Sequence, residues 1–280
     1  MGTESSEVRN LDGDGAGTVT ASEATGRGDA DQVVALGRGL EILECFRVGE
    51  RYLGNQDIAK RTGLPKATVS RLTRTLVNLG YLGYSEALGK YRLGNAVLPL
   101  GFSLLSSMDV RHVARPFMHA LADYAQAAVS FGVRDRLTMV YVENCQGNAL
   151  LTLRLDVGSV IPLATTAMGR AYLCAVPAPE RDQLMDQLKV QYSEQWPKVK
   201  VGLEQAVRDF HDKGFCVSAG EWQQDIHAVG VPLVLRDDMG VLGFNCGGPA
   251  FQLRRPALEE DLGPRLVNLV RNVEVALGQR

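Results

Sequence analysis

Residues 55–80 carry the pattern that most constrains this chain, because they predict two short helices joined by a tight turn. A first helix fits Gln56 to Arg61, with Asn55 as its N-cap. Gly63 can take the left-handed backbone conformation that ends this helix, and Pro65 suits the first residue of the next. A helix, a four-residue turn that contains glycine and a second helix have the spacing of a helix-turn-helix.

The second of these helices runs to Leu79, and Gly80 is its C′ residue. One face is apolar and is expected to be buried; it consists of Val69, Leu72, Leu76 and Leu79. The other face offers hydrogen-bond donors and one small residue, namely Lys66, Ala67, Thr68, Ser70, Arg71 and Arg74. Such a face suits the major groove of DNA, because Arg and Lys bind guanine edges or phosphates and small side chains permit close approach. We therefore expect these six residues to bind DNA.

The flanking segments complete a winged helix-turn-helix. Upstream, residues 33–47 predict a helix with one apolar face made of Leu36, Leu40, Leu43 and Phe46. Downstream, residues 81–84 and 90–93 predict the arms of a β-hairpin, the wing, which makes Lys90 and Arg92 available for phosphates. A generic three-helix core with a hairpin is the alternative, but the turn, the apolar stripe, the basic face and the wing all favour DNA binding.

Charge is distributed unevenly along the chain. The 280 residues carry 30 basic and 32 acidic side chains, a formal charge of −2. Residues 38–95 hold ten basic against five acidic side chains, which is the footprint expected of a nucleic-acid-binding segment. Residues 1–31 hold seven acidic and two basic side chains with almost no aliphatic clusters, which predicts a disordered acidic tail.

Residues 109–280 alternate helical and strand-like patterns, which predicts an α+β domain. Strands are expected at 129–133, 139–143, 150–155, 215–218, 228–235 and 241–246. Helices are expected at 110–127, 167–176, 180–188, 203–213 and 262–277.

Short motifs follow one another in a fixed order along residues 33–280: LEIL at 40–43, IAKRTGLPKATVSRL at 58–72, YRLG at 91–94, PL at 162–163, TAMGRA at 166–171, GE at 220–221, VP at 231–232 and GGP at 247–249. Their order and spacing resemble the IclR family of bacterial transcriptional regulators. The resemblance implies a winged helix at 32–94, a linker helix at 95–108 and a GAF-like α/β effector-binding domain at 109–280. It also implies homodimers or homotetramers, a double-stranded DNA operator and a small-molecule effector, with either repression or activation as the outcome.

The same resemblance implies where the effector binds. In the family, loops equivalent to 158–166 and 219–226 surround the pocket, together with the adjoining strand ends. Matching the motifs gives the pocket positions Ala167, Met168, Ser218, Ile226, Ala228, Asn245 and Gly247. Ser218 and Asn245 are the more telling positions, because a polar side chain on an inward strand face needs a partner. Having Ala228 and Gly247 rather than hydroxyls or thiols favours a bulkier, partly apolar ligand, an acid or an aromatic metabolite of a catabolic pathway.

Two other classes of function compete with this one. A thiol- or carboxylate-dependent hydrolase would use Cys216 or Cys246 with His227 and Glu221, but no nucleophile-elbow, P-loop, dinucleotide or deaminase motif accompanies them. A DNA-binding architectural protein without an effector would leave residues 96–280 without a task. We therefore expect a regulator that is not an enzyme and needs no cofactor.

Cysteine and histidine usage, together with the apolar segments, indicates where the chain works. The five cysteines are scattered and form no CxxC motif, and the four histidines form no HxH or HExxH motif, so reduced thiols and no metal site are expected. The longest apolar stretch, 96–105, is too short to span a membrane, and no signal peptide is seen, so the chain is expected in the cytoplasm. Residues 95–107 have more apolar surface than a free linker needs, which predicts contact with a second copy.

Overall fold

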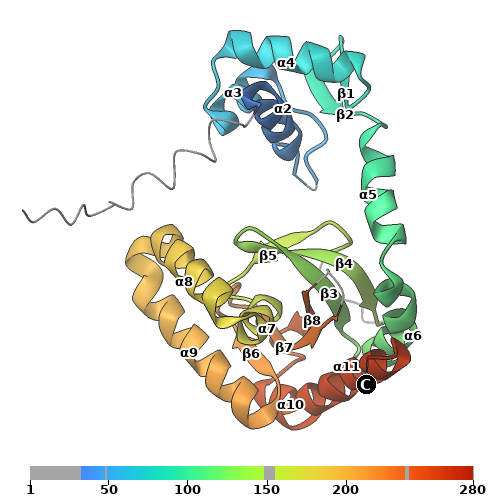
Figure 1. Cartoon of the computed structure of the whole chain (residues 1–280), viewed down its shortest axis with the longest axis vertical. Helices are drawn as coiled ribbons and strands as arrows, with labels where there is room; N and C mark the ends of the chain where they lie inside the picture. The colour runs from blue at the N-terminus through green and yellow to red at the C-terminus, as the bar shows by residue number, and fades with distance from the viewer. Residues whose placement is uncertain (1–32, 48, 148–154, 237–239, 280) are drawn as a thin grey trace, which may run out of the picture. The chain divides into compact units, whose positions relative to one another are not determined.

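The computed structural model describes residues 33–47, 49–147, 155–236 and 240–279. The chain divides into two compact units, one ending at Ala96 and one beginning at Val97 (Figure 1). The predicted acidic tail at 1–31 lies outside the described residues, as does the predicted strand at 150–155 apart from Leu155.

The first unit is a three-helix core with a hairpin. Its helices and strands are α2 (Val34–Glu44), α3 (Asn55–Thr62), α4 (Lys66–Asn78), β1 (Leu82–Ser85) and β2 (Lys90–Leu93). The strands pair antiparallel, and β2 also pairs with Leu53 through an isolated bridge at Tyr91. Gly63 and Gly80 both have positive φ, 69° and 79°, as a left-handed residue after each helix requires. The predicted winged helix-turn-helix is confirmed.

The helix ends differ from the prediction by one residue each. The N-cap of α3 is Gly54 rather than Asn55, and the Gly54 amide donates to Asp57 Oδ2 at 2.9 Å. The Asp57 carboxylate thus accepts the hydrogen bond of the N-cap amide at the start of α3. The Asn55 side chain is therefore free to reach α4. Pro65 is likewise the N-cap of α4, with an extended ψ of 140°, and not its first helical residue.

The apolar stripes of the first unit are shorter than predicted. Ile42, Ile58 and Val69 are fully buried, whereas Leu36, Leu40 and Leu79 are more than half exposed. Leu36 and Leu40 lie in the largely exposed first part of α2, and Leu79 follows the last residue of α4 as its C-cap, so within the described residues all three lie outside the buried core. Thr73 takes the buried place instead, because its hydroxyl donates to the Val69 carbonyl at 2.9 Å within the helix.

The second unit is built on a six-stranded antiparallel sheet in the order β5-β4-β3-β8-β7-β6. The strands are β3 (Ala128–Asp135), β4 (Thr138–Gln146), β5 (Val160–Pro162), β6 (Cys216–Ala219), β7 (Ile226–Val234) and β8 (Val241–Pro249). The longer helices are α5 (Val97–Ser106), α6 (Asp109–Ala125), α7 (Ala167–Ala175), α8 (Ala178–Tyr192), α9 (Trp196–Lys213) and α11 (Gly263–Ala276). Short helical turns occupy Ser193–Gln195, Arg255–Ala257 and Leu258–Leu262. The predicted α+β class is confirmed.

The two faces of this sheet are covered differently. On one face α6 and α11 pack over large apolar side chains, with the Phe131 and Phe244 rings stacked at 4.9 Å (Figure 1). On the other face α7, α8 and α9 cover a smaller cluster that includes Met139, Tyr141 and Met168. Because side chains alternate along each strand, Ala228 and Gly230 of β7 and Gly243, Asn245 and Gly247 of β8 share the face on the α7 side. Among the described residues, no helix is both long and apolar enough to cross a membrane.

Candidate functional site

The exposed face of α4 carries the side chains predicted to read DNA. Of the six predicted residues, Thr68 is half-buried and the other five are exposed: Lys66, Ala67, Ser70, Arg71 and Arg74. Within the described ranges, the cations Lys66, Arg71 and Arg74 make no salt bridge, so their charges remain available to a partner. The structure thus brings together on one helix the positive surface that phosphates require.

A hydrogen bond fixes α4 relative to α3. Asn55 Nδ2 donates to Ser70 Oγ at 2.7 Å and lies 3.5 Å from the Lys66 carbonyl. Sequence reasoning missed this role of Asn55 because it placed the residue as a cap. The sequence pattern that could have indicated this contact is a polar residue, Asn55, at the start of α3 together with a serine, Ser70, one turn into α4.

The wing places two further cations at the surface. Lys90 and Arg92 are both exposed on β2. Arg92 lies across Gly83 of the paired strand, where a Cβ would be only 3.2 Å from the guanidinium carbon, and its Nη1 donates to the Leu93 carbonyl at 3.3 Å. Glycine at position 83 therefore lets the guanidinium lie flat on the hairpin.

Not every cation of the basic segment is available for DNA. Arg61 forms a bidentate ion pair with Glu50, with Nη1–Oε2 and Nη2–Oε1 distances of 2.5 and 2.8 Å. Its Nη1 also donates to the Cys45 carbonyl at 2.7 Å. The hydrogen bond from Arg61 holds the pKa of Glu50 below its usual value. Arg61 therefore connects α3 to the segment after α2 instead of presenting its charge to a ligand.

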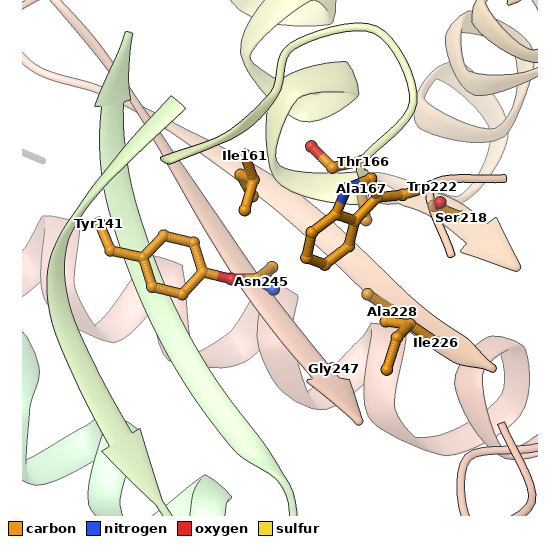
Figure 2. A pocket seen from close by; sticks show the side chains of 10 residues that line it. All are labelled: Tyr141, Ile161, Thr166, Ala167, Ser218, Trp222, Ile226, Ala228, Asn245 and Gly247. Atoms are coloured by element: carbon orange, nitrogen blue, oxygen red, sulfur yellow. The ribbon is translucent and has the colours of Figure 1, made fainter. Parts of the chain in front are cut away.

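A cavity of about 20 Å³ lies in the second unit between the sheet and the start of α7 (Figure 2). Six of the seven predicted pocket residues line it, namely Ala167, Ser218, Ile226, Ala228, Asn245 and Gly247. Met168 does not line it, because its side chain is fully buried against Gly132 and Gly243. The residues that the prediction missed are Tyr141, Ile161, Thr166 and Trp222.

Glycines in the sheet set the position of α7. A Cβ at Gly230 would lie 2.2 Å from the Ala167 carbonyl oxygen, and one at Gly243 would lie 2.7 Å from Met168. Both glycines therefore allow the helix backbone to rest directly on β7 and β8. The first turn of α7 is thereby held at the wall of the cavity.

The turn before α7 is tied down by hydroxyl groups. Thr166 is the N-cap: its Oγ1 accepts the Gly169 amide at 3.2 Å and donates to the Pro162 carbonyl at 2.7 Å. Ser218 Oγ donates to the Thr165 carbonyl at 2.8 Å, which joins β6 to the same turn. The first amides of a helix have no partner inside it and carry partial positive charge, so this wall of the cavity favours an anionic group.

The opposite wall is polar and buried. Asn245 is 7% exposed, and its Oδ1 has no hydrogen-bond partner in the described part of the chain. Burial raises the pKa of Tyr141 to about 12, and hydrogen bonds with Asn245 and Ser130 act in the opposite direction. The Tyr141 hydroxyl points toward Asn245 (Figure 2). Because its pKa is raised, this hydroxyl is neutral at physiological pH. A buried acceptor without a donor is costly, so Asn245 is a position where a ligand's hydroxyl or amine would be stabilised.

The loop that carries Trp222 lines the cavity and is held in place by Arg170 of α7. Arg170 is 3% exposed, and its Nη1 donates to Glu221 Oε2 at 2.7 Å and to the Val217 carbonyl at 3.1 Å. Gly202 of α9 makes room for this guanidinium, since a Cβ there would lie 2.3 Å from Arg170 Nη2. Arg170 and Glu221 belong to the motifs quoted above, whereas the position of Trp222 had no periodic signal.

The residues considered for a hydrolase are not assembled for catalysis. Cys246 lies on the α6 side of the sheet, where burial raises its pKa to about 12. His227 Nδ1 is bonded to the Leu253 carbonyl at 2.8 Å, and Glu221 is paired with Arg170. The described ranges hold no group of three or more side chains suited to a metal ion.

Comparison with known proteins agrees with both units. The family model described as "Bacterial transcriptional regulator IclR C-terminal" matches residues 102–273, and the "IclR helix-turn-helix domain" matches residues 35–86. The HTH-type transcriptional regulator TsaQ1/TsaQ2 of Comamonas testosteroni is 37% identical over 247 residues, 88% of each chain. The crystal structure of an IclR family regulator from Brucella abortus has a TM-score of 0.82 and 51% identity over 89% of this chain and 94% of that one.

An IclR homolog from Microbacterium hydrocarbonoxydans, crystallised with 4-hydroxybenzoate, shares the fold, with a TM-score of 0.66 and 20% identity over 88% of this chain and all of that one. Two family models that together span both units, and a relative 37% identical along most of the chain, agree with the winged helix and the cavity-bearing sheet. The chain therefore belongs to the IclR family of bacterial transcriptional regulators, which are DNA-binding proteins and not enzymes.

Proposed function

We propose that this regulator binds operator DNA through α4 and the wing, and that a small organic acid or aromatic metabolite in the cavity changes its DNA affinity. In this proposal residues 32–94 are the DNA-binding domain, 95–108 the linker helix and 109–280 the effector-binding domain. The protein works in the cytoplasm as a homodimer or homotetramer and controls a catabolic operon. The cations Lys66, Arg71 and Arg74, which are exposed and make no salt bridge with any described residue, support the first part.

The observation that carries the effector site is Asn245 Oδ1, which has no hydrogen-bond partner in the described part of the chain and belongs to a residue that lines the same cavity as the start of α7. The start of α7 favours a carboxylate or sulfonate, because a helix N-terminus attracts negative charge. Asn245 Oδ1 favours a hydroxyl or amino donor at the other end of the ligand. The side chains between them are apolar, with Ile161, Ile226 and Trp222 in the lining, which suits a ring or short aliphatic body.

The size of the cavity sets a further condition. A volume of about 20 Å³ has room for roughly one water molecule, whereas a ligand the size of a benzoate needs several times more. Trp222 lies in the loop between β6 and β7, outside any helix or strand, and is a large side chain in the cavity lining. We infer that the ligand enters as the Trp222 indole moves outward, and that Arg170 holds the base of the loop in place.

Calorimetric titration with three probes tests the site: 4-hydroxybenzoate, benzoate and 4-methylbenzoate. The wild-type protein should bind 4-hydroxybenzoate about tenfold more tightly than benzoate, because only the hydroxyl satisfies Asn245; tenfold corresponds to about 1.4 kcal/mol. The Asn245→Leu variant should lose this preference while still binding benzoate.

A matched control is Asn268→Leu, which changes an exposed asparagine on α11 and should keep the preference. Binding of none of the three probes would contradict a small aromatic acid as the effector. Equal binding of 4-hydroxybenzoate and benzoate would contradict only the proposed role of Asn245 and would leave the aromatic acid as the effector class.

The assembly has its own support in α5. Its large apolar side chains are more than half exposed, namely Leu98, Leu100, Phe102 and Leu104. A second copy of the chain would remove this surface from water, and a pair of winged helices would read enough base pairs to find an operator. Light scattering should give two or four times the chain mass of 30.4 kDa, and a species of 30.4 kDa alone at micromolar concentration would refute the assembly.

A further inference from the structure

Two thiols lie against each other at the far end of α7. Cys174 belongs to the last turn of α7 and Cys216 begins β6, and their Sγ atoms are 3.7 Å apart. We propose that Cys174 and Cys216 form an oxidation site, a dithiol that a hydroperoxide converts to an intramolecular disulfide. This proposal goes beyond the effector site and does not depend on it.

The pair differs from the other cysteines of the chain. Cys45, Cys145 and Cys246 are buried, and among the described residues none of them contacts another sulfur. Burial raises the pKa of Cys145 to about 11 and that of Cys246 to about 12, so both remain unreactive thiols. Among the five cysteines, only the Cys174–Cys216 pair combines a contact between two thiols with partial solvent access, which Cys174 provides.

The two thiols are not equivalent. Cys174 is half-buried and can be reached by a small oxidant, whereas Cys216 is fully buried, with its Sγ 3.5 Å from the Ala206 carbonyl oxygen. The hydrogen bond with Cys216 lowers the pKa of Cys174, and the charges of Arg181 and Arg170 act in the same direction. The hydrogen bond with Cys174, followed by burial, raises the pKa of Cys216. Cys174 is therefore the attacking thiol and Cys216 the resolving one.

The chemistry balances with a hydroperoxide as the only co-reactant. The Cys174 thiolate attacks the terminal peroxide oxygen, the O–O bond breaks, and the leaving alkoxide or hydroxide takes up a proton. The resulting sulfenic acid is attacked by Cys216 sulfur, the new S–S bond forms, and the oxygen leaves with the Cys216 proton as water. Two thiols are oxidised by two electrons, and one peroxide is reduced to water and an alcohol, or to two waters.

The surroundings permit the bond to close. A disulfide needs the sulfurs at about 2.05 Å, so they must approach by less than 2 Å. Their neighbours in the same cluster are the small residues Ala171 and Ala206, with Phe210 at its edge. Small neighbours leave the two side chains free to rotate toward each other. The crosslink would join α7 and β6, the two elements that also supply Ala167 and Ser218 to the cavity.

The test uses the full-length reduced protein and hydrogen peroxide. After one equivalent of peroxide, the protein is denatured, its thiols are alkylated and its intact mass is measured. Reduced protein should take up five labels. Oxidised protein should take up three, with a mass before labelling about 2 Da lower, and peptide mapping should find Cys174 linked to Cys216. Dithiothreitol should restore all five labels.

Two variants and a control complete the test. Cys174→Ser should keep its four remaining thiols under the same treatment, and Cys216→Ser should stop at a Cys174 sulfenic acid that dimedone traps. Cys45→Ser, in the other unit, should still form the disulfide. Should Cys216→Ser fail to fold, the wild type and Cys174→Ser decide the question alone. Five labels on peroxide-treated wild type, or a disulfide that involves any other cysteine, would overturn the proposal.

Discussion

The two functional regions of this regulator are built in opposite ways. The proposed DNA-binding face is a row of mostly exposed side chains on α4, and the helix that carries them is held by its own backbone hydrogen bonds. The cavity is an enclosed space where α7, five strands and a loop meet, and its shape depends on backbone contacts at Gly230 and Gly243. A surface site tolerates exchange of one residue at a time, whereas an enclosed site depends on the packing that surrounds it.

The largest effect is expected from closing the space under α7. Gly230→Val places a side chain where a Cβ alone would be 2.2 Å from the Ala167 carbonyl oxygen. Because the obstacle is backbone, the second unit should lose about 3 kcal/mol or more of its free energy of unfolding. Urea denaturation followed by circular dichroism measures this loss. Gly39→Ala is the control, since Gly39 has nothing within 4 Å and lies in α2; that variant should be neutral or slightly stabilised. Equal stability of the two variants would mean that α7 does not rest on the sheet.

A smaller effect is expected from removing one cation of α4. Arg71→Ala or Arg74→Ala should weaken DNA binding by about 1–3 kcal/mol where the side chain reads a base, and should leave the fold intact because both are exposed. Fluorescence anisotropy on a duplex selected by the wild-type protein from a random pool measures the loss. Arg208→Ala, an exposed arginine of α9, is the matched control. Undiminished binding by the Arg71→Ala, Arg74→Ala double variant would place the DNA-binding face elsewhere.

Filling the cavity should separate sensing from DNA binding. Ala228→Trp occupies the space between β7 and α7, so the variant should bind DNA normally and lose its response to the effector. The response at stake is a coupling free energy of about 1–3 kcal/mol, or fivefold to 150-fold in operator affinity. The measurement is the anisotropy titration repeated with and without the probe acid that binds best. A normal response in this variant would show that the effector binds at another place.

The smallest effect concerns an ion pair at the surface. The Arg61 hydrogen bond lowers the pKa of Glu50, so the pair stabilises the folded state above the ordinary pKa of a glutamate and loses this contribution as pH falls through the lowered value. Glu50→Gln should therefore lower the melting temperature slightly at pH 7, and the difference from wild type should disappear as pH falls through the lowered pKa of Glu50. A difference that grows on acidification would contradict this account. Because the pair is exposed, the shift should shrink in high salt.

The comparison also explains how far sequence alone could go. The exposed basic face of α4 followed from periodicity, since a helix places every third or fourth residue on one side whatever the rest of the fold does. Leu79 was wrongly assigned to the buried stripe because periodicity does not reveal where a core ends, and Thr73 was missed because its hydroxyl is satisfied inside the helix. Asn55 was placed one position out because Asp57 caps the helix instead.

The cavity could not be derived from periodicity in the same way. The six predicted residues that line it came from matched family motifs. Met168 came from the same motifs, but its side chain packs on the sheet against Gly132 and Gly243. Tyr141 was missed because it comes from β4, a strand outside the predicted loops, which pairing with β5 brings to the cavity. Ile161, Thr166 and Trp222 lie within the predicted segments 158–166 and 219–226, but the motifs did not single them out. Which strands become neighbours is a property of the whole fold, and no local pattern contains it.

The contact between α7 and the sheet has a mechanical consequence. No layer of side chains separates the helix from β7 and β8 at Gly230 and Gly243, so side-chain rotation cannot absorb a displacement of its first turn. A ligand that moves this turn must therefore bend the strands themselves, and the opposite face of the same sheet carries α6, which follows α5 along the chain. Protein interiors have low compressibility and transmit such strain over several residues. Through the stiffness of this glycine contact, occupancy of a small space would become displacement of a sheet.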